Sequence, residues 1–363
     1  MEKSPLTATR ATATAAAGPV SVVATLAGRP AAGGAGLADL GRKVRCLEVR
    51  ADLAGDVDPA PLRRGFSGSL LYTLRSAAEG GCCADPPERR RVRLLAAADH
   101  YDFVDLEASR DLHVDVLDRI PPERRVISWH GPATGLAGLR RRFDSLAAVA
   151  AGLYRLGAHA ESQAQALVPL LLLKSLARGD VTAYAGGPAG TWTRVVAARF
   201  GAPVVFGRLD DPPAAAVQAP ADGEPPLHRL LADYPHQVLS RAERLYGIIG
   251  ASPMMSLAPL VYNTAYRSLG LPALYVPFST DDLRRSLDEL KPGLDRLGLP
   301  LSGATVVAPH KDAALALATE ASPLARRAAA ASLLVRTESG WRADTEAAGV
   351  VATLASRKVG ARP

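Results

Sequence analysis

Short apolar runs recur through the first 209 residues, and stretches of helix length with amphipathic patterning separate them. Eight such runs, alternating with helices, predict a (β/α)8 TIM barrel, a fold of the α/β class. In barrels of this kind the chemistry lies at the carboxyl ends of the strands. The runs are Val22–Arg29, Cys46–Leu53, Leu70–Gly80, Tyr101–Ser109, Val126–Gly131, Gly157–Ala164, Val181–Gly187 and Ala202–Leu209.

A second, shorter α/β pattern follows. The expected strands are Leu245–Ile249, Ala273–Val276 and Ala304–Val307, and the expected helices are Ala258–Leu269 and Thr280–Leu290. This alternation predicts a small, mostly parallel sheet. We therefore expect a disordered tail over 1–18, a barrel domain over 19–235 and a small α/β domain over 244–356. A Pro- and Ala-rich stretch, Asp210–Pro226, predicts a lid or loop beside the barrel.

Composition narrows the function classes. The formal net charge of +7 is modest. The arginine runs Arg89–Arg93 and Arg140–Arg142 are interpreted as solvated faces rather than as a nucleic-acid site, because no aromatic-rich basic stripe accompanies them. Three cysteines indicate a reducing, cytoplasmic location and no metal site. No apolar run reaches membrane-spanning length. Whether the chain forms a homodimer is left open.

Polar side chains stand where the predicted strands end. A histidine there can move protons near neutral pH, and arginines can bind a carboxylate through two hydrogen bonds. Glutamate on the strand next to the histidine can orient its ring. The residues at these ends are Glu48, Arg50, Arg75, Glu107, His130 and Arg194.

These segments resemble type I 3-dehydroquinate dehydratase. The matching pieces are Leu47–Arg50, Thr73–Gly80, Val104–Glu107, Ser128–His130 and Gly190–Phe206. The resemblance implies His130 as the acid/base, Glu107 as the residue that orients it, and a small cyclic carboxylate as ligand. It also implies that the substrate is bound by Glu48, Arg50, Arg75, Arg194 and Gln218.

The family carries a lysine at the end of strand six, where it forms an imine with the substrate ketone. In an ungapped match that position is Ser162, which cannot form an imine. A shift of one residue offers Glu161 or Gln163 instead, and Lys174 is the nearest lysine. The resemblance therefore predicts an altered mechanism.

The second region resembles the substrate-binding domain of shikimate dehydrogenase, through Tyr246–Phe278, Gly303–Lys311 and Asp344–Gly349. Ser256 and Lys311 match the family, and Glu346 stands where it has an aspartate. Other polyol-binding positions differ. They are Ala258, Thr305, Val307 and Ser332. No glycine-rich turn follows a strand, so no nicotinamide cofactor and no working dehydrogenase are expected.

Two functions remain open at this stage. The first is a lyase that resembles the dehydratase and acts on a cyclic carboxylate without an imine. The second is a non-catalytic descendant that senses a ligand or serves as a protein scaffold.

Overall fold

The computed structural model describes residues 20–28, 37–209, 223–234 and 239–346. It divides into two compact units, Met1–Ser240 and Arg241–Pro363. The predicted tail over 1–18 and Gln218, together with most of the predicted lid, lie outside the described residues. Nowhere in the described residues does a helix reach the length and apolar character needed to cross a membrane.

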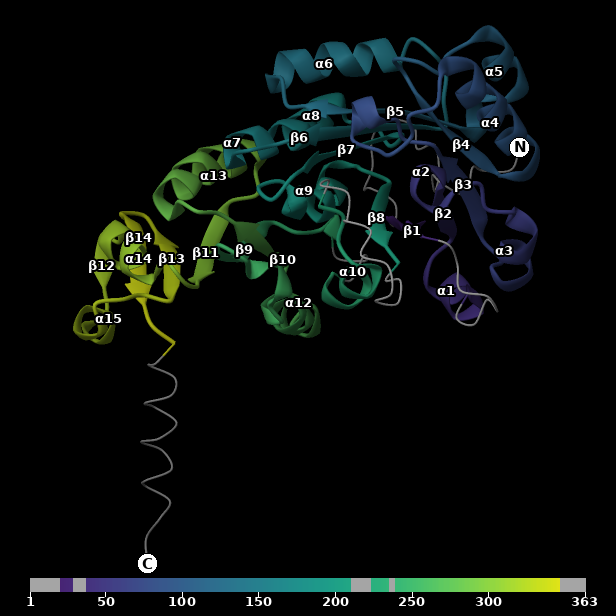
Figure 1. Ribbon diagram of the computed structural model, residues 1–363. Coiled ribbons are helices and arrows are strands. Elements are labelled where there is room, and N and C mark those ends of the chain that lie inside the picture. The colour runs from purple at the N-terminus through teal and green to yellow at the C-terminus, as the bar shows by residue number, and fades with distance from the viewer. Residues whose placement is uncertain (1–19, 29–36, 210–222, 235–238, 347–363) are drawn as a thin grey trace, which may run out of the picture. The chain divides into compact units, whose positions relative to one another are not determined.

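The first unit is a barrel of eight parallel strands (Figure 1). The hydrogen-bonded order is β7-β6-β5-β4-β3-β2-β1-β8. Strands β7 and β8 stand at the two ends of this order. Between them, Thr182 Oγ1 donates a hydrogen bond to the Val204 carbonyl at 3.2 Å. The strands are β1 Ser21–Leu26, β2 Cys46–Arg50, β3 Ser69–Thr73, β4 Phe103–Glu107, β5 Arg125–Pro132, β6 Leu153–His159, β7 Val181–Gly186 and β8 Val204–Arg208.

Helices and short 3-10 turns connect the barrel strands, as the βα alternation predicted. They are α1 Leu37–Lys43, α2 Ala51–Ala54, α3 Pro59–Gly65, η1 Ala77–Glu79, α4 Pro87–His100, α5 Val114–Arg119, η2 Pro122–Arg124, α6 Gly135–Leu146, α7 Gln163–Ala166, α8 Val168–Leu176, α9 Thr191–Val196, η3 Ala197–Phe200 and α10 Leu227–Asp233.

Side chains inside the barrel form layers, because every second residue of a strand points inward. The layer near the amino-terminal strand ends is apolar. It consists of Val23, Cys46, Leu71, Phe103, Val126, Leu153 and Val204, and Phe206, two residues further along β8, belongs to the same apolar cluster. Two residues further along β1 to β6, polar groups take the same inward direction. These buried groups are Thr25, Glu48, Thr73, Asp105, Ser128 and Arg155. An apolar floor thus supports a polar layer just below the barrel mouth.

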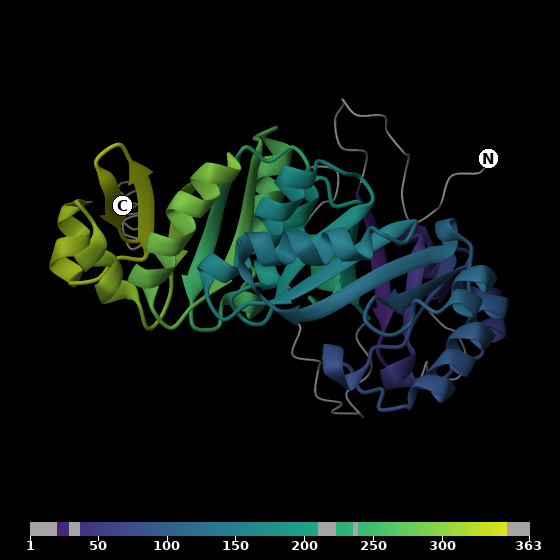
Figure 2. The ribbon, with the colours of Figure 1, turned by 90° about the horizontal axis from the view of Figure 1, so that it is seen from above.

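The second unit is built on a six-stranded sheet in the order β10-β9-β11-β13-β14-β12. Strands β10, β9 and β11 run parallel, whereas β13 is antiparallel to both of its neighbours. Figure 2 shows α13 lying along this sheet. The elements are β9 Arg244–Gly250, η4 Pro253–Met255, α12 Ala258–Ser268, β10 Ala273–Ser279, α13 Leu283–Leu297, β11 Leu301–Val306, α14 Lys311–Leu317, β12 Glu320–Ala321, α15 Pro323–Ala328, β13 Leu333–Thr337 and β14 Gly340–Asp344.

Candidate active site

A buried ion pair crosses the barrel interior from β6 to β2. Arg155 Nη1 donates to Glu48 Oε1 at 2.6 Å, and both side chains are 0% exposed. Thr25 and Thr73 donate their hydroxyls to the same carboxylate, each at 2.8 Å. Burial would raise the pKa of Glu48, but Arg155 and two further arginines lower it to about 2. Glu48 is therefore an anion that anchors the Arg155 guanidinium at the centre of the barrel.

Three further arginines stand near the strand ends. Arg50 binds Asp52 through two hydrogen bonds of 2.8 Å, so its guanidinium is fixed in one plane. The Arg194 guanidinium, from α9, lies 3.9 Å from the centre of the Tyr184 ring. Arg75 follows β3 and is buried, like the other two. With Arg155 included, four buried guanidiniums gather near the barrel mouth, and carboxylates pair two of them, Arg155 with Glu48 and Arg50 with Asp52.

His130 lies at the carboxyl end of β5 with a partner on each side of its ring. Its Nδ1 is 3.4 Å from Glu79 Oε2, and its Nε2 is 3.3 Å from the Tyr184 hydroxyl. The backbone N–H of His130 also donates to Glu79 Oε2, at 2.8 Å. Gly157, paired with His130 in the next strand, makes room for the ring, because an added Cβ would lie 2.4 Å from His130 Cδ2. The imidazole is thus held in one position.

Burial sets the protonation states of His130 and Glu79. It lowers the pKa of His130 well below 6.5, and the positive charges of Arg75 and Arg155 lower it further. Burial and the nearby Glu107 carboxylate raise the pKa of Glu79 to about 8. At neutral pH the imidazole is therefore uncharged and the Glu79 carboxyl is largely protonated. An uncharged imidazole is the form that can accept a proton from a substrate.

The carboxyl group beside His130 comes from Glu79, not from Glu107 as expected. Glu107 accepts a hydrogen bond from the Ser76 backbone at 2.6 Å and pairs with Arg110 at 2.9 Å and with Arg90 at 3.4 Å. The interpretation of Glu107 as the residue that orients the histidine was wrong. The turn after β3 places Glu79 beside β5. The order of the strands along the sequence does not reveal this contact.

The predicted bounds of strand six were also wrong. The strand is Leu153–His159, and Ser162 caps the helix after it, accepting a hydrogen bond from the Gln165 N–H at 3.3 Å. Lys174 is exposed on the outer helix α8. The inward cation of strand six is Arg155. Its charge interrupts the apolar run Leu153–Ala158. For this reason the hydrophobic pattern of the sequence did not identify the strand at its true position.

The second unit brings two of its three predicted site residues together. Lys311 Nζ lies 3.5 Å from Glu346 Oε1, with side chains 43% and 65% exposed. The Glu346 backbone N–H donates to Ser332 Oγ at 2.9 Å. Ser256 Oγ accepts the N–H of Ala258, the first residue of α12, at 3.1 Å. An ion pair this exposed contributes at most about 1 kcal/mol and does not define a site by itself.

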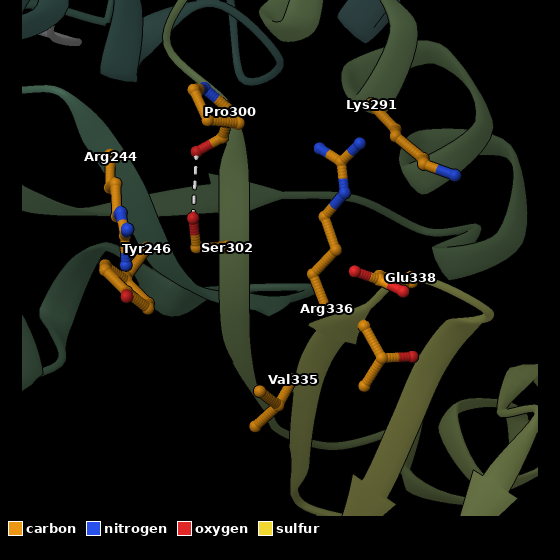
Figure 3. A pocket seen from close by; sticks show the side chains of 9 residues that line it. Arg244, Tyr246, Lys291, Pro300, Ser302, Val335, Arg336 and Glu338 are labelled. Atoms are coloured by element: carbon orange, nitrogen blue, oxygen red, sulfur yellow. Dashed lines mark hydrogen bonds between the residues drawn. The ribbon is translucent and has the colours of Figure 1, made fainter.

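A hollow of about 680 Å³ lies at the other end of β11 from Lys311 (Figure 3). Arg336, at its rim, binds Asp295 through two hydrogen bonds of 2.6 and 2.8 Å. None of the predicted site residues lines this hollow. Its lining is Arg244, Tyr246, Lys291, Pro300, Ser302, Val335, Arg336, Thr337 and Glu338.

Sequence reasoning missed three residues of the barrel site: Glu79, Arg155 and Tyr184. Glu79 and Tyr184 stand within segments that had already been singled out as strand ends. Every second residue of a strand points inward, so Leu153 and Arg155 share the inward face. This alternation would have identified Arg155 if the bounds of strand six had been predicted correctly. Among the residues with described positions, no group of three His, Cys, Asp or Glu side chains is placed to hold a metal ion.

These features define a (β/α)8-barrel protein with a buried histidine site among arginines. The chain belongs to the type I 3-dehydroquinase family, whose sequence profile matches residues 32–230. Residues 248–334 match the shikimate dehydrogenase substrate binding domain. Both resemblances inferred from the motifs, and their order along the chain, are therefore confirmed.

Individual relatives match one or both of these parts. The chain is 28% identical over 307 residues to a bifunctional 3-dehydroquinate dehydratase/shikimate dehydrogenase of Arabidopsis thaliana, covering 81% of this chain and 48% of that protein. A 3-dehydroquinate dehydratase of Methanothermobacter thermautotrophicus is 31% identical over 170 residues, which is 45% of this chain and 75% of that one. The structure of dehydroquinate dehydratase and shikimate dehydrogenase from S. pombe AroM aligns with a TM-score of 0.47 and 20% identity, over 90% of this chain and 64% of that chain. The chain thus spans about half the length of the Arabidopsis protein.

Proposed function

We propose that the barrel is a carbon–oxygen lyase site for a cyclic, carboxylate-bearing substrate, in which His130 moves the protons. The observation that carries this proposal is the buried His130 imidazole, held between Glu79 and Tyr184 among buried arginines. The arginines supply the charge that a carboxylate needs. The imidazole supplies the acid and base that an elimination needs.

Each side chain then has a definite task. His130 accepts the proton from carbon and returns it to the leaving hydroxyl. Glu79 holds the ring through Nδ1 in place of the predicted Glu107. Arg50, fixed by Asp52, presents donors in a constant orientation.

The three free cysteines support the reducing, cytoplasmic location inferred from the sequence.

The mechanism does not use an imine, because a guanidinium occupies the inward position of strand six. We expect 3-dehydroquinate to bind without forming a covalent adduct. Calorimetry should detect binding, and intact mass spectrometry after borohydride treatment should show the unmodified chain. An adduct on any lysine would restore the ordinary mechanism, and an absence of binding would contradict the proposed ligand class.

Removal of Arg194 should weaken ligand binding. Arg194→Ala is expected to reduce the affinity for 3-dehydroquinate by about 2 kcal/mol or more, as for removal of one partner from a buried charge pair. Isothermal titration measures this change. Arg140→Ala is the matched control, because Arg140 pairs with Asp144 on the surface, at a side-chain exposure of 48%. Equal affinities in the two variants would show that Arg194 does not bind the carboxylate.

A second candidate is a non-catalytic ligand sensor, which is favoured by the guanidinium at Arg155 and by the altered polar set of the second unit. His130→Ala separates the two functions. If the barrel is a lyase, this variant should lose release of water from 3-dehydroquinate entirely while still binding it. A wild-type chain that binds 3-dehydroquinate without converting it would favour the sensor.

For the second unit we propose a structural or interface role rather than hydride transfer. Thr305, Val307 and Ala258 stand where the related enzymes bind their polyol, and each lost hydrogen bond costs about 1 kcal/mol. Titration with reduced nicotinamide cofactor should leave its fluorescence unchanged. Saturable binding at micromolar concentration would contradict this assignment.

A further inference from the structure

The absence of an imine raises a chemical question about the barrel. A carbon next to a ketone loses its proton readily only when the ketone oxygen is stabilised as negative charge develops on it. An imine does this in the related enzymes, but Arg155 cannot form one. The following inference rests on the proposed function and asks which groups stabilise that oxygen.

The hydrogen bonds around Tyr184 run in one direction. Arg155 Nε lies 3.0 Å from the Tyr184 hydroxyl, and a guanidinium can only donate. The Tyr184 oxygen is therefore an acceptor there, and its single proton is left to point to His130 Nε2 at 3.3 Å. Nε2 then carries no proton, so the ring proton sits on Nδ1, facing Glu79. The order is Arg155 to Tyr184 to His130 to Glu79.

Arg155 also carries a buried donor that lacks an acceptor. Its side chain is 0% exposed, and among the described residues no hydrogen-bond acceptor reaches Nη2. The Phe206 ring lies 3.8 Å from the guanidinium carbon and covers one face of it. A buried donor without a partner destabilises the folded state, so its retention needs a reason. A ligand oxygen would supply the missing acceptor.

We propose that Arg155 and Tyr184 together receive the ketone oxygen of a cyclic keto acid, and that Tyr184 is a catalytic residue of this barrel. Arg155 Nη2 donates to the oxygen from one side. The Tyr184 hydroxyl turns from His130 Nε2 to the same oxygen. This turn has a second consequence, because it frees the Nε2 lone pair to act as the base.

The proposed reaction is balanced without any co-reactant. His130 Nε2 takes a proton from the carbon next to the ketone, and the C–H electron pair forms a C=C bond. The carbonyl π pair moves onto the oxygen, where Arg155 and Tyr184 hold it. The pair then returns to re-form the C=O bond. The C=C electrons shift to the neighbouring carbon as its C–O bond breaks, and His130 gives its proton to the leaving hydroxyl. One water is released, and nothing is oxidised or reduced.

Deuterium exchange tests whether Arg155 and Tyr184 assist the first step of the proposed reaction, which is removal of the proton from carbon. In D2O, the wild type should accelerate exchange at the carbon next to the ketone of 3-dehydroquinate, observed by proton NMR. Tyr184→Phe should reduce the exchange rate at least tenfold, with the dissociation constant changed by less than about threefold. Tyr154→Phe is the matched control, because the Tyr154 hydroxyl donates to the Val149 carbonyl at 2.8 Å, away from His130. Undiminished exchange in Tyr184→Phe would overturn the inference.

Nitrogen NMR of the histidine rings tests the hydrogen-bond order without any substrate. In protein labelled with 15N-histidine, His130 should show a protonated Nδ1 and an unprotonated Nε2, assigned by its loss in His130→Gln. Tyr184→Phe should shift the Nε2 signal, and Tyr154→Phe should not. A protonated Nε2 in the wild type would mean that His130 donates to Tyr184. That result would reverse the order of the hydrogen bonds and refute the inference.

The outcomes separate the inference from the function on which it rests. If 3-dehydroquinate neither binds nor exchanges in the wild type, the proposed function fails and the inference fails with it. If it binds and exchanges, and Tyr184→Phe exchanges equally fast, only the inference fails. Folding of Tyr184→Phe is checked by the unchanged dissociation constant.

Discussion

Arg155→Met is expected to lower the free energy of unfolding of the barrel by about 3–5 kcal/mol, the range for loss of one partner from a buried ion pair. Glu48 would keep its charge in a fully buried position after losing the guanidinium 2.6 Å away. The methionine side chain fills much of the space, so the cost comes from the unpaired charge rather than from a cavity. Urea unfolding, followed by tryptophan fluorescence, measures it.

Two controls identify the cause. The chain has three tryptophans, so a Trp341→Phe background leaves only those of the barrel, Trp129 and Trp192. Arg140→Met removes an exposed partner of Asp144 and should cost less than about 1 kcal/mol. Adding Glu48→Gln to Arg155→Met should recover part of the loss, because the buried charge is then gone. If the double variant is no more stable than Arg155→Met, the buried charge is not the cause.

Glu79 should make the stability of the barrel fall as pH rises. Its pKa is raised from 4.5 to about 8, mainly by burial, so between these values the folded chain holds a proton that the unfolded chain has lost. Stability is therefore lost as pH rises through this window. Between pH 5.5 and 8, the difference in unfolding free energy between the wild type and Glu79→Gln should fall by about 2–3 kcal/mol.

The comparison with Glu79→Gln is necessary because His130 acts in the opposite direction. Its pKa is lowered by burial, so the unfolded chain binds a proton that the folded chain lacks, and stability rises as pH rises towards 6.5. Both proteins contain His130, so this contribution largely cancels in the difference. Glu123→Gln, at an exposed position, is the control. A constant difference from pH 5.5 to 8 would mean that Glu79 is ionised in the folded chain.

The sequence was sufficient for the architecture. Eight apolar runs with helices between them specify a barrel, because parallel strands buried on both faces must be apolar and must be joined by long crossovers. The second unit was predicted in the same way, and its expected strands overlap β9, β10 and β11. Periodicity is a local property, so it survives in a single sequence.

Strand six shows where this reasoning fails. A charged residue in the middle of a strand lowers its apolar score, although Arg155 is buried as deeply as its neighbours. Its charge is compensated by Glu48, which lies 107 positions earlier in the chain. No local pattern can report a partner at that separation.

The sequence by itself determined the fold, its two parts and most of the polar residues at the barrel mouth, because these follow from alternation along single strands. Only the tertiary structure decided which of them touch. It placed Glu79 rather than Glu107 beside His130, and it placed the Tyr184 hydroxyl between the His130 ring and Arg155. The physical reason is that the barrel brings together side chains from distant strands and turns. Hydrogen bonds and burial there depend on separations of a few ångströms, which linear spacing does not encode.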